Sequence, residues 1–213
     1  MKTNRHVVTM AFLMFASLWI TGCASFSRQR LVEVGTIQPP ADATLAAKAT
    51  YRFTSGVDMG VGPRQDHAPN VRQQLEKEFV DFLTTSGYFA SLVPGQNGDI
   101  QLEADLVNYG DAIAAALAGA IGGLSLCTIP CWATDNYRLK VKVVTAQGKT
   151  GVYLLDDAMT TVIWLPMIVV MPFKFPIGVS NEVRTNMYKH LILRMQQDGF
   201  LPPAKPAPQN TPA

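Results

Sequence analysis

The sequence has no surplus of charge of either sign. Lys and Arg number 18 and Asp and Glu 16 among 213 residues. Two of the basic residues, Lys2 and Arg5, lie in an N-terminal segment that we expect to be removed, and the remaining chain is then formally neutral. A neutral chain lacks the basic field that recruits nucleic acid or anionic lipid. We therefore expect no nucleic-acid binding.

Cysteine and histidine are scarce, with three residues of each. A metal site at Cys127 and Cys131 would need His67 or His190 as further ligands, and nothing in the sequence brings either histidine near. In an oxidising compartment a disulfide between Cys127 and Cys131 is the better interpretation. Free thiols and metal or redox chemistry remain as alternatives. We expect no metal ion.

The sequence also lacks an evident catalytic constellation. The sequence shows no nucleophile with an adjacent base, and no pair of carboxylates placed as in the pocket of an enzyme. Asp156 and Asp157 are the nearest pair, but neighbouring residues of a strand point to opposite faces. They indicate a bulge or a bend. We therefore expect no catalytic residues, no enzyme activity and no cofactor.

The N-terminus has the layout of a secretory signal. Positive residues precede an apolar stretch from Val7 to Ile20, and this stretch is shorter than the roughly 20 residues that a spanning helix needs. Residues 20–23, Ile-Thr-Gly-Cys, resemble the lipobox of bacterial lipoproteins. A cleaved signal with an incidental cysteine is the alternative.

The lipobox resemblance implies an address and an anchor. Residues 1–22 would be the signal peptide, and Cys23 would become the first residue, carrying diacylglycerol and an acyl chain. Ala24 rather than Asp follows the cysteine, which in this family implies sorting to the outer membrane, facing the periplasm. The lipid bilayer would then be a partner through Cys23.

The rest of the chain divides into a tether, one domain and a tail. Residues 23–49 are expected to form a lipidated N-terminus and flexible tether, although residues 31–37 would also suit an edge strand. Residues 50–200 are expected to form a periplasmic domain. The stretch 201–213 contains five prolines and is expected to be disordered.

Hydrophobic periodicity predicts an α+β domain. Period-two alternation indicates strands, and apolar residues at i, i+4 and i+8 indicate amphipathic helices. Ser180 suits the N-cap of the last helix. The economical arrangement is a small, mainly antiparallel sheet with two helices on one face, interrupted by an apolar insert. The expected elements are strands at 50–58, 99–108, 137–145 and 150–164, with a turn at 147–148, and helices at 70–86 and 180–199.

Two of these strands carry opposite charge on their outward positions. Glu103 and Asp105 lie on one, and Arg138, Lys140 and Lys142 on the other. We expect the strands to be neighbours, because opposite charges across a sheet stabilise it slightly. A charged docking surface is the alternative.

The insert, residues 112–133, contains no charged residue and is rich in Gly and Ala. Ala115, Gly119 and Gly123 recur at every fourth position, the small-residue spacing that lets helices approach closely in lipid. A helix from Ala112 to Pro130 would be about 27 Å long, marginal for a hydrocarbon core of about 30 Å. Partial insertion, contact with another protein, and burial in the domain core all compete with a full span.

A second uncharged run covers residues 158–173. A hairpin at residues 147–148 would bring it beside the insert, with Trp132 and Trp164 at the base of one apolar protrusion, where aromatic rings suit a membrane boundary. Residues 112–133 and 162–173 would then dock on the membrane, on a second copy or on an envelope protein. The alternative is that both runs fold back and complete the core.

Residues 50–110 are loosely similar to small periplasmic α/β lipoproteins, some without known function and some auxiliary to envelope transporters. Fold similarity does not carry function across. We expect a non-catalytic structural or assembly component of the envelope. A transporter auxiliary, with a lipid-sized apolar cavity between sheet and helices, is the first alternative, and an enzyme is the second.

Overall fold

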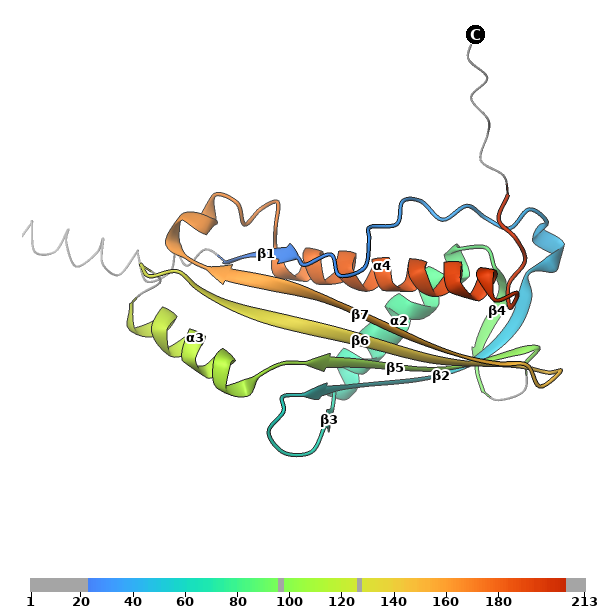
Figure 1. Ribbon diagram of the computed structural model, residues 1–213, viewed down its shortest axis with the longest axis horizontal. Coiled ribbons are helices and arrows are strands. Elements are labelled where there is room, and N and C mark those ends of the chain that lie inside the picture. The colour runs from blue at the N-terminus through green and yellow to red at the C-terminus, as the bar shows by residue number, and fades with distance from the viewer. Residues whose placement is uncertain (1–22, 96–97, 126–127, 206–213) are drawn as a thin grey trace, which may run out of the picture.

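The computed structural model describes residues 23–95, 98–125 and 128–205, which form one twisted sheet with two long helices on one face (Figure 1). In chain order the elements are β1 (Cys23–Ser27), the 3-10 turn η1 (Ala43–Leu45), β2 (Ala47–Asp58), β3 (Gln65–Asp66), α2 (Pro69–Thr85), β4 (Phe89–Pro94), β5 (Ile100–Tyr109), α3 (Ala112–Leu124), β6 (Cys131–Thr145), β7 (Thr150–Ile163), the 3-10 turn η2 (Leu165–Ile168) and α4 (Pro176–Gln197).

The predicted α+β fold is confirmed. Across the described residues the sheet has seven strands in the order β1-β7-β6-β5-β2-β3, with β4 also pairing to β2. The pairs of β2 with β4 and with β5 are parallel, and the other four pairs are antiparallel. The parallel pairs arise because α2 returns the chain to the same end of the sheet, as crossover helices do.

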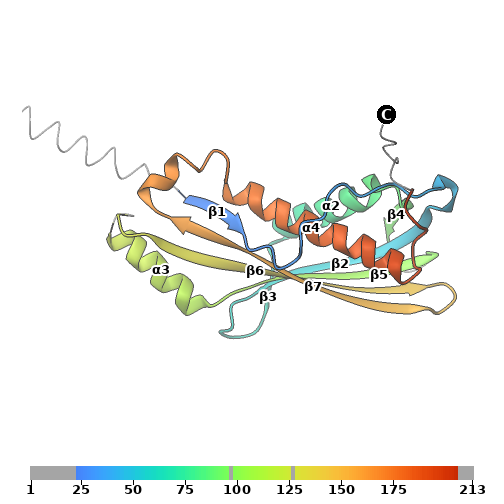
Figure 2. The same cartoon turned by 45° about the horizontal axis from the view of Figure 1, so that its top comes forward.

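The helices α2 and α4 cover the same face of the sheet, and α3 lies apart from them (Figure 2). Alternate residues of β5 and β6 point into this layer and are buried. An aromatic group joins the elements: the ring centroids of Phe53 and Phe79 lie 5.5 Å apart, and those of Phe79 and Tyr188 5.4 Å apart. Gly87 ends α2 with a φ of 80°, which is the left-handed conformation that favours glycine.

The two oppositely charged strands are neighbours, as the sequence predicted. In the β5–β6 register Glu103 lies opposite Lys142, and Asp105 lies opposite Lys140. Lys142 Nζ is 3.4 Å from the Glu103 carboxylate. Asp105 instead forms its closest ion pair with Arg64, at 2.6 Å. Charges of both signs are thus paired with one another on this face of the sheet. This pairing favours a role in sheet stability over a charged docking surface.

Residues 23–49 differ from the flexible tether that the sequence suggested. Cys23–Ser27 forms an edge strand antiparallel to β7, and Ala24 and Ser25 are fully buried. The chain then follows α4, where the Asn186 side chain accepts a hydrogen bond from the amide of Val34 at 2.9 Å. The edge of β7 offers unpaired backbone groups, and the N-terminal residues satisfy some of them.

The last helix and the tail also differ from expectation. The helix α4 begins at Pro176, whose fixed φ suits the first helical position, and Ser180 lies inside the helix rather than at its N-cap. Of the predicted disordered tail, Leu201 is buried and the Lys205 amide donates to the Pro39 carbonyl at 2.9 Å. Residues 206–213 lie outside the described residues.

The Glu103–Lys142 pair provides a test of the register. Lys142→Glu should lower the free energy of unfolding by at most about 1 kcal/mol, because it places two exposed carboxylates opposite each other. Adding Glu103→Lys should recover part of that loss in urea unfolding. As a control, Lys142→Glu combined with Asp81→Lys on α2 should be additive. A coupling energy of zero in the first pair would contradict the register.

Candidate functional site

The candidate site is the end of the molecule at which β6 and β7 extend beyond β5. The β5–β6 pairing stops at Tyr109 opposite Asn136, whereas β6 and β7 continue to the pair Cys131–Ile163. In this extension β1 pairs with β7, and α3 takes the place beside β6 that β5 has left (Figure 1). We call this part, with the η2 region that follows β7, the apolar end.

The helix α3 begins at a clear N-cap. Asp111 accepts hydrogen bonds from the amides of Ile113 and Ala114 at 2.9 and 3.1 Å. The helix ends at Leu124, short of the Pro130 expected from the sequence, and its 13 residues make it about 20 Å long. Among the described residues, no helix has both the length and the apolar character to cross a membrane.

The helix α3 is apolar on all sides and is mostly exposed. The side chain of Leu117 is 59% exposed and that of Ile121 is 47% exposed. No α3 residue with a described side chain is fully buried. A helix that is hydrophobic all round is normally found inside a protein or a membrane. This arrangement disagrees with the alternative that the insert completes the domain core.

The second uncharged run lies at the same end. After β7 the chain makes the η2 turn and returns beside β1, where the Ser25 amide donates to the Lys174 carbonyl at 2.8 Å. Phe173 is 85% exposed. The indole Nε1 of Trp164 donates to the Thr128 carbonyl at 3.2 Å and so connects the two runs. The structure therefore brings both runs together at one end of the sheet.

The predicted contact residues lie on this surface. Trp132 is 65% exposed on β6, while Trp164 is half-buried. Ala115 is exposed on α3. A side chain added at Gly119 or Gly123 would meet no heavy atom within 4 Å. The small-residue face of α3 is therefore open. Leu117, Ile121 and Phe173 were not among the contact residues predicted from the sequence, although the absence of charge around them was the signal.

The cysteines do not form the predicted disulfide. Cys131 is a buried free thiol, and its Sγ lies 3.7 Å from the Ile163 carbonyl oxygen. Cys131 is the first residue of β6, and its side chain is on the face of the sheet that the helices cover. Cys127, its predicted partner, lies outside the described residues. Cys23 is also a free thiol and is half-buried as the first residue of β1.

Asp156 and Asp157 point to opposite faces, and their register with β6 is continuous, without a bulge. Asp156 accepts from Arg138 Nε at 2.8 Å on the uncovered face. Asp157 is buried and accepts from the Arg30 amide at 3.1 Å. These carboxylates therefore hold the sheet and the N-terminal segment together. Residues 23–95, 98–125 and 128–205 contain no cluster of three or more His, Cys, Asp or Glu that would suit a metal ion.

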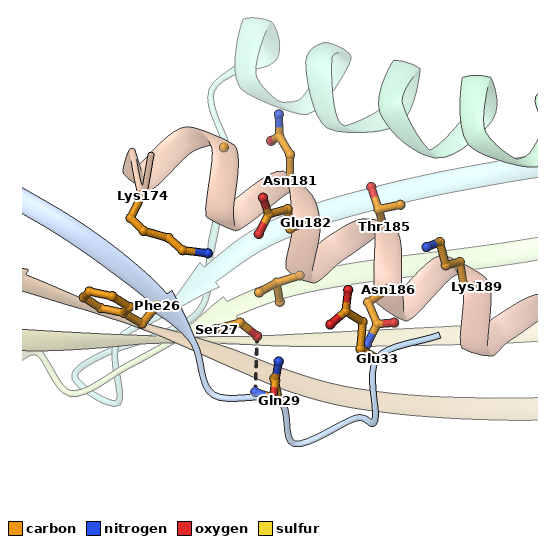
Figure 3. Close-up of a pocket in the computed structure, with 12 residues that line it drawn as sticks. Phe26, Ser27, Gln29, Glu33, Lys174, Asn181, Glu182, Thr185, Asn186 and Lys189 are labelled. Atoms are coloured by element: carbon orange, nitrogen blue, oxygen red, sulfur yellow. Dashed lines mark hydrogen bonds between the residues drawn. The ribbon is translucent and has the colours of Figure 1, made fainter. Parts of the chain in front are cut away.

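A polar groove of about 760 Å³ separates the N-terminal segment from the first half of α4 (Figure 3). Acidic and basic side chains both line it, including Glu33 and Glu182 with Lys174 and Lys189. The Lys189 ammonium donates to the Val34 carbonyl at 2.9 Å. The groove lies along the contact between the N-terminal segment and α4, and it carries charges of both signs.

The openness around α3 predicts the result of adding side chains there. Gly119→Leu combined with Gly123→Leu should leave the thermal unfolding midpoint of the protein within a few degrees, because nothing is displaced. As a control, Gly151→Leu should lower the midpoint clearly, because its Cβ would lie 2.9 Å from the Phe200 ring. Unfolding of the double variant would show that α3 packs in the core.

The comparisons with known proteins are distant. No family model matches the sequence, and no curated protein matches it. Among solved structures, the chain is similar to protein XCC0632 of Xanthomonas campestris, described as family DUF330, with a TM-score of 0.38 and 11% identity over 79% of this chain and 97% of that one. It is also similar to a PelC dodecamer of Paraburkholderia phytofirmans, with a TM-score of 0.29 and 10% identity over 76% and 97%. Similarity this low leaves function to be argued from the chain's own residues.

Proposed function

We propose that this protein is a lipid-anchored, non-catalytic component of the bacterial envelope, whose apolar end rests on the periplasmic surface of the outer membrane. The observation that carries the proposal is the position of Cys23. The lipobox cysteine is the first residue of β1, and β1 lies beside the extension of β7 at the apolar end. An acyl chain on Cys23 would therefore enter the bilayer next to the exposed apolar residues.

The absence of a tether makes the two contacts act together. Cys23 lies opposite Ile163 in the sheet, and Ile163 lies opposite Cys131. Strands are about 4.8 Å apart, so the row from Cys23 to Cys131 is about 10 Å wide. Trp132 follows Cys131 in the chain, and Trp164 follows Ile163. A bilayer that holds the acyl chains of Cys23 is thus within reach of both tryptophans.

The apolar surface suits shallow insertion. The helix α3 is too short to span the bilayer, but an exposed apolar helix is suited to the boundary between headgroups and acyl chains. Asp111 and Asp135 bound the uncharged insert, and Lys174 follows the second run. These charges mark where the inserted surface would stop, because ionised side chains are costly in hydrocarbon.

Two functions follow for the apolar end. It adds a second contact between the anchored protein and the membrane beside the acyl chains on Cys23, and apolar area buried at the interface strengthens membrane binding. It also fixes the orientation of the domain, so that the β6–β7 turn at residues 146–149 points away from the membrane (Figure 1). This orientation suits a structural or assembly component that presents one end to the periplasm.

The anchor is tested by Cys23→Ser in cells that produce the full precursor. The variant should be uncleaved at the lipoprotein site or released to the soluble periplasm, whereas the wild type should fractionate with the outer membrane. Normal processing together with outer-membrane fractionation of the variant would contradict the anchor.

The apolar contact is tested with the Cys23→Ser mature chain and vesicles of a zwitterionic phospholipid. Sedimentation with vesicles should show residual binding, and Leu117→Lys with Ile121→Lys should reduce it roughly tenfold or more, because lysine is costly in the bilayer. The matched control is Val152→Lys with Leu154→Lys, two exposed apolar residues on the sheet, which should leave binding unchanged.

The same material separates the membrane from a second copy as the occupant of the apolar end. Analytical ultracentrifugation without lipid should show a monomer. A stable oligomer that the Leu117→Lys, Ile121→Lys variant dissociates, without any vesicle binding, would replace the membrane by a homo-oligomeric interface.

A further inference from the structure

A small cavity of about 170 Å³ lies between the sheet and the two covering helices, near the start of α2. One wall is apolar and consists of Val71 and Leu75 on α2 and Leu106 on β5. Val71 is 39% exposed and so lies at the surface side of the cavity. This space is far below the roughly 300–1,000 Å³ of an ordinary small-molecule pocket, and it is too small for a membrane lipid.

The other wall is polar, with one side chain from each surrounding element. His67 precedes α2, Asn108 is on β5, Tyr137 is on β6, and Arg184 is on α4. On β5 the preceding inward positions are apolar, and on β6 the following ones are apolar as well. Polar residues therefore replace the apolar pattern only where the strands reach the cavity.

Arg184 is the least expected member of this wall. It is 7% exposed, and arginine is almost never buried unless it is paired. Its Nε and Nη2 donate to the Glu78 carboxylate at 3.0 and 2.8 Å, and Nη2 also donates to Asn181. These bonds pair the guanidinium with Glu78 and Asn181 through its Nε and Nη2 atoms, at the wall of the cavity.

His67 offers a buried group without a partner. Its Nδ1 is buried and has no hydrogen-bond partner among the described residues, which is costly for a polar atom. Burial, with help from the charges of Arg64 and Arg184, lowers the pKa of His67. The neutral ring can donate from one nitrogen.

The remaining polar groups also favour an acceptor. Burial raises the pKa of Tyr137 to about 12, so its hydroxyl keeps its proton and can donate. Val71 is in the first turn of α2, where backbone amides have no partner within the helix and the helix dipole is positive. Asn108 is already hydrogen-bonded to the Asp135 carboxylate, so the donors that the polar wall offers to a ligand are His67, Tyr137 and Arg184, opposite an apolar wall.

We propose that this cavity binds the carboxylate of a small acid that carries a short alkyl chain. The carboxylate accepts hydrogen bonds from the Arg184 guanidinium, His67 and the Tyr137 hydroxyl, and the alkyl chain packs on Leu75, Leu106 and Val71. Arginine beside neutral donors is the usual recognition of a carboxylate. The site is independent of the apolar end, so its test does not depend on membrane binding.

The test uses the purified mature protein and sodium butyrate as the probe. Its thermal unfolding midpoint should rise saturably with butyrate, because a ligand that binds only the folded state stabilises it. Sodium chloride and butylamine hydrochloride at equal ionic strength should not reproduce the rise. Acetate should bind roughly tenfold more weakly than butyrate, because two fewer methylene groups are buried.

A matched pair of variants locates the site. Tyr137→Phe should weaken butyrate binding about three- to tenfold by removing one donor. Tyr153→Phe removes the hydroxyl of another buried tyrosine, which bonds Asp198 at 2.9 Å, and should leave the butyrate affinity unchanged. His67→Phe should weaken binding to a similar degree as Tyr137→Phe.

Four results would overturn the proposal. These are an unfolding midpoint that does not respond to butyrate, an equal response to chloride, acetate binding as tightly as butyrate, and equal effects of Tyr137→Phe and Tyr153→Phe on the affinity. Each of these results would contradict one part of the proposal: the binding of the carboxylate, the packing of the alkyl chain, or the position of the site at this cavity.

Discussion

The long antiparallel ladder of β6 and β7 is the constraint on which the rest of the structure depends. It runs without interruption from Val144–Thr150 at the turn to Cys131–Ile163 at the far end. One part of it forms the covered sheet with β5, and the other part extends beyond it. In the extension α3 occupies the edge of β6 that β5 has left, and β1 occupies the outer edge of β7. The apolar end therefore exists because the β6–β7 hairpin extends beyond the part of the sheet that β5 pairs with.

If Cys23 carries the proposed anchor, pairing of β1 with β7 would also fix the orientation of the domain at the membrane. A flexible tether of 25 residues would let the domain move tens of Å from the membrane, and contacts between domain and bilayer would then be incidental. Five paired residues remove that freedom. The proposed anchor and the apolar surface would then act as one unit, and binding of the first would raise the effective concentration of the second at the bilayer.

Local patterns predicted most of the fold but little of the long-range detail. Period-two alternation located the strands, and the charges of Glu103 and Lys142 indicated which strands adjoin, because both signals lie within one or two strands. The place of β1 depended on an edge more than 130 residues away along the chain, to which Cys23–Ser27 gives no local signal. The polar wall of the cavity near the start of α2 was not predicted for the same reason. Arg184 has no local signal of burial, and only the structure shows that it is buried and paired with Glu78 of α2.

The properties of α3 argue that its apolar residues serve contact rather than folding. An isolated helix of this length is only marginally stable in water, and α3 has little beyond its Asp111 cap and its contact with β6 to support it. Its glycines lower the stability further, by about 1 kcal/mol each relative to alanine. Residues kept for the core would be buried, yet Leu117, Ile121 and Leu124 are exposed. A surface that buries these residues would therefore stabilise the helix further as it binds.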